Sequence, residues 1–77
     1  MNTTLKSYRH YKGGSYTLLM VARNSEARDE LLAVYVSHRT QQVWARPWAM
    51  FNEPVTWPDG VSRPRFVEIE QGQPPHV

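Results

Sequence analysis

Apolar and polar side chains alternate over several short stretches of this chain, and turn residues separate those stretches. The clearest alternation covers residues 15–23 and predicts one continuous strand face made of Tyr16, Leu18, Met20 and Ala22. The opposite face is also largely apolar, which is typical of a curved strand covered on both sides. Weaker alternation predicts further strands over residues 5–12, 43–46 and 65–70.

The segment 24–36 supports two interpretations. Residues 24–30 are polar and typical of a turn, and Val34-Tyr35-Val36 favours a strand over 31–37, because β-branched and aromatic side chains suit a pleated sheet. Alternatively, Asn24 or Ser25 could cap a helix over 26–36 with an apolar side. We expect the strand.

Prolines mark the second half of the chain. Pro47 lacks a backbone N–H and has a restricted φ, so residues 47–51 are predicted to form one helical or 3-10 turn. Three further prolines and the pair Asp59-Gly60 predict a loop over 52–64. Several short strands joined by tight turns predict a mainly β fold, either a small barrel or a strongly bent sheet of about five strands.

Composition limits the classes of protein that remain. The 77 residues predict a single domain, 1–77, with a core over about 5–70 and a disordered tail at 71–77. Cysteine is absent, which excludes disulfides and Cys-based metal sites. The longest apolar runs are far shorter than the roughly 20 residues that span a bilayer. We therefore expect a cytoplasmic protein with no membrane partner and no cofactor.

The basic side chains are unevenly distributed. Residues 1–25 contain four basic and no acidic side chains, whereas residues 26–77 contain five basic and seven acidic ones. This asymmetry predicts a basic surface near the N-terminus. A committed DNA-binding protein makes roughly six to ten phosphate contacts, so nucleic acid stays open as a partner but is not favoured.

Four motifs carry a resemblance to a known family. They are Tyr-Arg-His-Tyr-Lys-Gly at 8–13, Val-Ala-Arg-Asn-Ser-Glu at 21–26, Val-Tyr at 34–35 and Trp-Ala-Arg-Pro-Trp-Ala-Met-Phe at 44–51. Their order and spacing resemble a small bacterial family of unknown function, over residues 6–70. The resemblance implies an SH3-like β-barrel and no particular activity. The chain departs from the pattern at Ala27-Arg28, where such proteins usually carry a threonine.

The first and last motifs hold the candidate binding residues. Cations attract an anionic ligand and aromatic rings stack on a planar one, so a surface that mixes the two can bind a ligand with both features. The predicted binding residues are Tyr8, Arg9, His10, Tyr11, Lys12, Arg46 and Trp48. Strand alternation also places Trp44 on the same face as Arg46. We nevertheless expect Trp44 and Phe51 to fill the core. As an alternative to ligand binding, Arg46 could pair with Glu53 or Asp59.

His10 is the one histidine inside a dense motif. A general base or metal ligand would need a partner, and no acidic residue lies within fifteen positions of His10. The structural alternative is a strand histidine that packs on Tyr16 or binds a backbone carbonyl, and Gly13-Gly14 is expected to be a hairpin turn. We predict no metal site and no catalytic residue.

These observations favour a non-catalytic binding module. Its partner is expected to be a protein segment or a small anion. The alternative is a small barrel that binds RNA or single-stranded nucleic acid, and a third hypothesis is an enzyme centred on His10.

Overall fold

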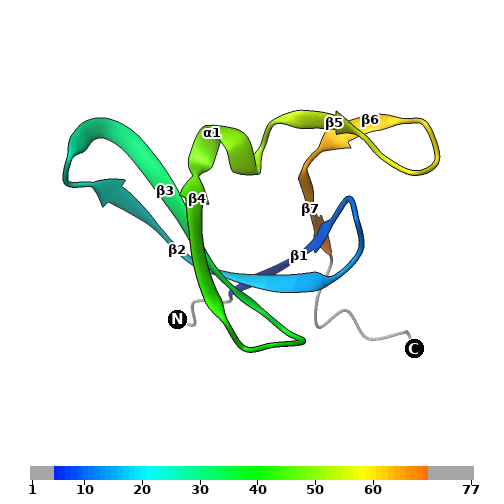
Figure 1. Ribbon diagram of the computed structural model, residues 1–77, viewed down its shortest axis with the longest axis horizontal. Helices are drawn as coiled ribbons and strands as arrows, with labels where there is room; N and C mark the ends of the chain where they lie inside the picture. The colour runs from blue at the N-terminus through cyan, green and yellow to red at the C-terminus, as the bar shows by residue number, and fades with distance from the viewer. Residues whose placement is uncertain (1–4, 70–77) are drawn as a thin grey trace.

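A computed structural model describes residues 5–69. Five strands form one antiparallel sheet in the order β4-β3-β2-β1-β7 (Figure 1). They are β1 (Lys6–His10), β2 (Ser15–Asn24), β3 (Ala27–Ser37), β4 (Val43–Pro47) and β7 (Phe66–Ile69). The helix α1 (Trp48–Phe51) follows β4, and a separate two-stranded sheet contains β5 (Pro54–Thr56) and β6 (Ser62–Pro64). The predicted mainly β fold, with about five strands and one short helical turn, is confirmed.

Some predictions concern residues that the structure does not describe. Glu70, at the end of the predicted last strand, and the predicted disordered tail 71–77 lie outside the described residues. Within residues 5–69, no helix has the length and apolar character needed to cross a membrane.

The segment 24–36 is a strand, and it begins earlier than expected. β2 and β3 pair as a long hairpin that continues to Asn24 opposite Ala27. The Asn24 side chain stabilises the tight turn, because its Oδ1 accepts the backbone N–H of Glu26 at 2.8 Å and its Nδ2 donates to Glu30 at 2.7 Å. Asn24 therefore supports a hairpin turn instead of capping a helix.

The predicted loop over 52–64 is partly wrong, because β5 and β6 form a hairpin there. Pro54 begins one strand and Pro64 ends the other, positions where a missing N–H removes little from the ladder. The hairpin is held by the Trp57 indole N–H, which donates to the Pro64 carbonyl at 3.0 Å. An ion pair between Arg63 and Asp59 at 2.7 Å adds a second link. Proline content alone could not reveal this pairing.

An irregularity in β2 corrects the predicted strand face. Leu18 pairs with Tyr35, but Met20 pairs with Val34, so one extra residue is inserted between them. Such a bulge exchanges the two faces of a strand and bends it. Tyr16 and Leu18 consequently face the core, whereas Met20 lies on the outer face and is 57% exposed. The sheet curves strongly at this point (Figure 1).

The core is built mainly from aromatic rings on the inner face of the curved sheet. Its most buried members are Ala33, Tyr35, Phe51 and Phe66. Phe51 from α1 stacks on Phe66 from β7, with ring centroids 4.2 Å apart and an interplanar angle of 2°. The expectation that Phe51 is core is confirmed, but the same expectation for Trp44 is wrong, because Trp44 is 53% exposed.

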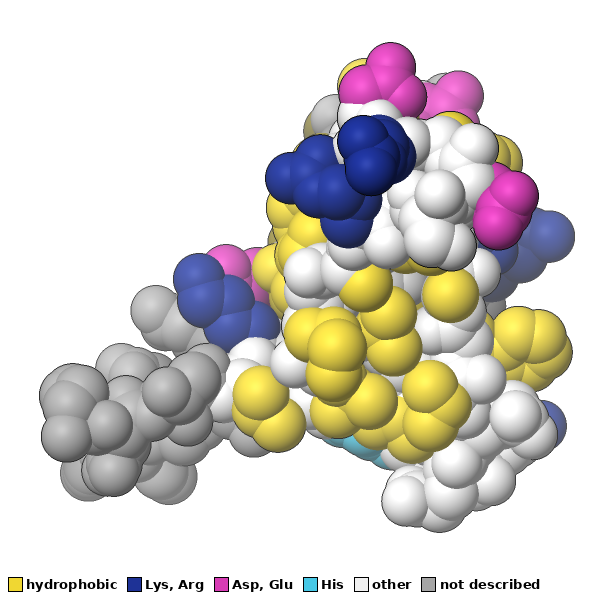
Figure 2. All heavy atoms as spheres, turned by 90° about the vertical axis from the view of Figure 1, so that its left-hand side faces the viewer, with side chains coloured by type: hydrophobic (Ala, Val, Ile, Leu, Met, Phe, Trp, Pro, Cys, Tyr) yellow, Lys and Arg dark blue, Asp and Glu magenta, His cyan; other side chains and the backbone are white. Residues whose placement is uncertain are grey.

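The outer face of the sheet is apolar as well. Met20 and Val43 are among its exposed residues, and Val34 and Val36 lie between them on β3. Figure 2 shows hydrophobic side chains gathered on the side of the molecule where β2, β3 and β4 lie. Tyr35, Trp44 and Arg46 lie on the opposite, inner face of the sheet.

Candidate functional site: a basic and aromatic hollow

The inner face of the sheet forms part of a hollow of about 340 Å³. We call it the basic–aromatic hollow, lined by His10, Tyr16, Tyr35, Ser37, Thr40, Trp44, Arg46 and Phe66. Strand register explains this gathering, because side chains directly opposite each other share a face. Trp44 lies opposite Tyr35, and His10 lies opposite Phe66. Residues distant in the sequence therefore converge on one surface.

Arg46 is the cation of this hollow. Its Nε donates a hydrogen bond to the Tyr35 hydroxyl at 3.3 Å, and its guanidinium lies 5.9 Å from the Phe66 ring centroid. The expected carboxylate partners are engaged elsewhere, since Glu53 pairs with Arg65 and Asp59 pairs with Arg63. Among the ion pairs between described residues, none involves Arg46. Its charge is thus available to an anionic ligand.

His10 lies beside Arg46 and is half-buried. Burial of the ring lowers the His10 pKa below its usual value, and the nearby charges of Arg46, Arg65 and Lys12 lower it further. Its Nδ1 accepts the backbone N–H of Lys12 at 3.1 Å. The neutral ring therefore carries its proton on Nε2, which makes His10 a hydrogen-bond donor at neutral pH.

We expected, as one alternative, that His10 would pack on Tyr16 or bind a backbone carbonyl, and its contacts agree with this only in part. Its ring meets Phe66 at 4.7 Å and Tyr16 at 6.2 Å between centroids, so the expected contact with Tyr16 exists. The backbone group that it binds is an N–H, however, and not a carbonyl. In the part of the chain that the structure describes, no group of three His, Cys, Asp or Glu residues is placed to hold a metal.

A second hollow of about 250 Å³ adjoins the first, and we call it the cationic hollow. Lys12 and Arg39 supply its charges, and the turn Gly13-Gly14 forms part of its wall. Tyr16, Ser37 and Thr40 line both hollows, which joins them into one surface. Neither lining includes an acidic residue. Together they present three arginine or lysine side chains to any ligand.

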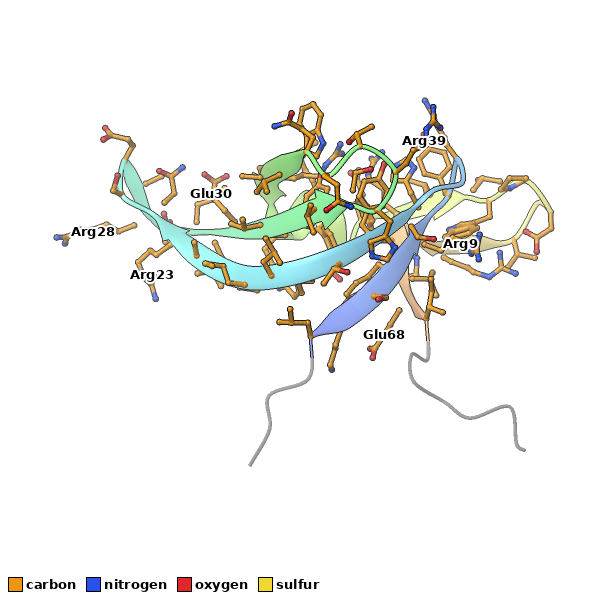
Figure 3. The ribbon with its side chains drawn as sticks, turned by 90° about the horizontal axis from the view of Figure 1, so that it is seen from below. Arg9, Arg23, Arg28, Glu30, Arg39 and Glu68 are labelled. Atoms are coloured by element: carbon orange, nitrogen blue, oxygen red, sulfur yellow. The ribbon has the colours of Figure 1, made fainter. Side chains whose placement is uncertain are left out.

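The location of Arg39 depends on the turn between β3 and β4. Figure 3 shows Arg39 at the end of the sheet opposite to Arg23 and Arg28, which lie at the β2–β3 hairpin. Arg39 thus lies at the same end as the β1–β2 turn, and it lines the cationic hollow together with Lys12. Arg39 is accordingly separated from Arg23 and Arg28 by the length of the sheet.

The predicted binding residues divide among several places. His10, Lys12 and Arg46 line the two joined hollows. Tyr8 packs edge-on against Phe51 at 5.1 Å and belongs to the core margin.

The remaining three lie outside both hollows. Arg9 is exposed on the outer face, because it alternates with Tyr8 and His10. Tyr11 lies between two cations, with Lys12 and Arg65 each under 6 Å from its ring centroid. Trp48 stacks on Phe51 at 5.5 Å and lines a separate hollow that also includes acidic residues.

Sequence reasoning missed part of the lining. Arg39, Ser37 and Thr40 were not predicted as binding residues, and neither were the rings of Tyr16, Tyr35 and Phe66. Whether these residues line a common hollow depends on which strands are neighbours in the sheet. The motif around Trp44 and Arg46 did carry a usable signal, because alternation on a strand predicted their shared face.

The fold and this site define a small mainly β domain with a basic and aromatic surface hollow. The chain belongs to the family described as "Protein of unknown function (DUF1653)", whose model matches residues 6–68. It is similar to a crystal structure of a DUF1653 protein from Bordetella bronchiseptica, with 31% identity over 88% of each chain and a TM-score of 0.73. A search of curated proteins finds no match. The predicted membership of a family of unknown function is confirmed.

Proposed function

We propose that this protein is a non-catalytic binding module that holds a small ligand with an anionic group and a planar ring. The observation that carries the proposal is the charge of the two joined hollows, which contain Lys12, Arg39 and Arg46 but no carboxylate in their lining. Uncompensated cations in a partly desolvated hollow attract anions more strongly than exposed cations do.

The geometry of Arg46 supports recognition of an anionic group. The Tyr35 hydroxyl accepts from its Nε, which orients the guanidinium and leaves its terminal nitrogens free to donate. Tyr35 is itself 4% exposed, so its position is set by the core. A rigid partner reduces the entropy that the arginine side chain loses when a ligand binds.

The aromatic lining supports recognition of a planar group. Trp44 is 53% exposed and makes no aromatic contact with another described residue, so a face of its indole is open to a ligand. The rings of Tyr35 and Phe66, by contrast, already meet at 5.3 Å in the core. A ligand ring placed on Trp44 would lie beside the guanidinium of Arg46 on the same face.

The proposal is tested with Arg46→Gln, using phenyl phosphate and benzoate as probes. Both probes should shift the NMR signals of the Trp44 indole and the His10 ring. A charge-assisted hydrogen bond contributes about 1.5–3 kcal/mol, so Arg46→Gln should weaken binding by about 10- to 150-fold. Benzyl alcohol lacks the charge and cyclohexanecarboxylate lacks the aromatic ring, and each should bind more weakly.

Arg9→Gln is the matched control, because it removes the same charge from the outer face. We expect Arg9→Gln to bind the probes like the unmodified protein, and both variants to melt within a few degrees of it. The proposal fails if the probes leave the Trp44 and His10 signals unchanged, or if Arg9→Gln weakens binding as much as Arg46→Gln. A large loss of melting temperature in Arg46→Gln would show that Arg46 has a structural role instead.

A further inference from the structure

We infer that the ligand is a nucleoside 5′-monophosphate, with its base in the basic–aromatic hollow and its phosphate in the cationic hollow. This inference rests on the proposed function and assigns a different part of the ligand to each hollow. The two hollows are continuous, because Tyr16, Ser37 and Thr40 line both. Volumes of about 340 and 250 Å³ together lie within the range of small-molecule sites.

The basic–aromatic hollow has the properties of a base site. The open face of Trp44 can stack on a heterocycle, since every base has a π face. With the phosphate on Lys12 and Arg39, the terminal nitrogens of Arg46 donate to the base, whereas with a small aromatic anion they donate to the anionic group. Neutral His10 adds a donor at Nε2. Keto oxygens and ring nitrogens are the acceptors that such donors recognise, and guanine offers both O6 and N7 to one guanidinium. The site is therefore expected to prefer guanine over adenine, whose amino group needs an acceptor.

The cationic hollow has the properties of a phosphate site. Lys12 and Arg39 line it, and neither takes part in an ion pair between described residues. The turn Gly13-Gly14 also lines this hollow, and both its φ angles are positive, at 99° and 90°. A Cβ at Gly13 would meet no atom within 4 Å, so space remains on this side of the turn. Two cations beside an open glycine turn suit a dianionic phosphate group.

The side-by-side position of the two hollows distinguishes a nucleotide from a smaller aromatic anion. The aromatic rings and the phosphate-binding cations lie in adjoining hollows, so one ligand must carry its ring and its anionic group some distance apart. A benzoate-like molecule would fill the first hollow and leave Lys12 and Arg39 unused. A nucleotide carries a ribose between base and phosphate, and the polar residues Ser37 and Thr40 line both hollows where they join. This arrangement favours the nucleotide over a smaller aromatic anion.

The test compares guanosine monophosphate with guanosine, adenosine monophosphate and phenyl phosphate, by calorimetry and NMR on the full chain. We expect guanosine monophosphate to bind at least tenfold more tightly than each of the other three. Trp44→Ala should weaken its binding by about 5- to 150-fold, the range expected for one base stacked on an aromatic side chain. The double variant Lys12→Gln/Arg39→Gln should weaken the binding of guanosine monophosphate at least tenfold and leave the binding of benzoate unchanged.

Arg28→Gln is the control for the double variant, because Arg28 lies at the opposite end of the molecule (Figure 3). The inference is overturned if guanosine monophosphate binds no more tightly than phenyl phosphate, or if Lys12→Gln/Arg39→Gln leaves its affinity unchanged. In either case, binding of phenyl phosphate and benzoate would leave the proposed function intact. If none of the probes binds, the proposed function fails as well.

A short oligoribonucleotide that begins with guanosine distinguishes a free nucleotide from the end of a chain. If its 5′-phosphorylated form binds more tightly than guanosine monophosphate, the ligand is a chain terminus; if it binds more weakly, the ligand is the free nucleotide. Either result supports the inference. If the 5′-phosphorylated form binds at least as tightly as guanosine monophosphate, equal binding of the 5′-hydroxyl form would overturn the inference, because the terminal phosphate would then make no contact with Lys12 and Arg39.

Discussion

The helix α1 permits a test of the core with two adjacent residues. Phe51 is fully buried, whereas Met50 beside it is 43% exposed. Both substitutions to alanine leave a residue that favours helix, so local helix propensity changes little in either variant. The difference in free energy of unfolding between Phe51→Ala and Met50→Ala therefore measures how much the packing of this helical turn against the sheet contributes to stability.

The structure indicates the size of that difference. The Phe51 ring meets Tyr8, Tyr35, Trp48 and Phe66, with centroid distances between 4.2 and 5.5 Å. Removing a buried phenylalanine ring costs about 3–5 kcal/mol in free energy of unfolding. An exposed substitution usually changes that free energy by about 0.5 kcal/mol or less. Small proteins have a free energy of unfolding of about 0.05–0.15 kcal/mol per residue, which gives roughly 4–12 kcal/mol for 77 residues.

The assay is urea unfolding followed by far-UV circular dichroism. Tryptophan fluorescence is unsuitable, because Trp48 stacks on Phe51 and would respond to the mutation itself. With a slope of about 1 kcal/mol/M for a small protein, a loss of about 3–5 kcal/mol means that Phe51→Ala should lower the urea midpoint by about 3–5 M or prevent folding. Phe51→Leu keeps most of the buried volume and should cost about 1–2 kcal/mol. Similar losses for Phe51→Leu and Met50→Ala would refute the packing described for α1.

Two further predictions concern ionisable groups. The folded-state pKa of His10 is lowered, so the unfolded chain binds its proton first, and stability should fall as pH drops below about 6.5. His10→Asn retains an acceptor for the Lys12 N–H but does not titrate. In urea titrations it should therefore lose less stability between pH 7.5 and 5 than the unmodified protein. An equal loss would contradict the lowered pKa of His10. Hydrogen bonds from Arg63 lower the Asp59 pKa to about 2, and NMR titration of Arg63→Gln should return it toward 3.8.

Much of the local structure could be predicted from sequence. The turn at Gly13-Gly14, the helical turn after Pro47 and the strand character of residues 15–23 follow from backbone restrictions and side-chain alternation. The expected burial of Phe51 is confirmed as well, but the same expectation for Trp44 is wrong. These features depend on neighbours within a few positions along the chain. The predicted membership of a family of unknown function is confirmed by the match over residues 6–68.

Tertiary structure decided how these elements combine. The inserted residue between Leu18 and Met20 exchanges the faces of β2, and nothing in a two-residue alternation marks its position. Strand pairing makes Phe66 a neighbour of His10, and the β3–β4 turn places Arg39 with Lys12 in the cationic hollow. Sequence alone therefore determined which residues are basic or aromatic and which segments are extended. The non-local pairing of strands determined which of those residues share a surface, because register and sheet order depend on contacts between distant segments.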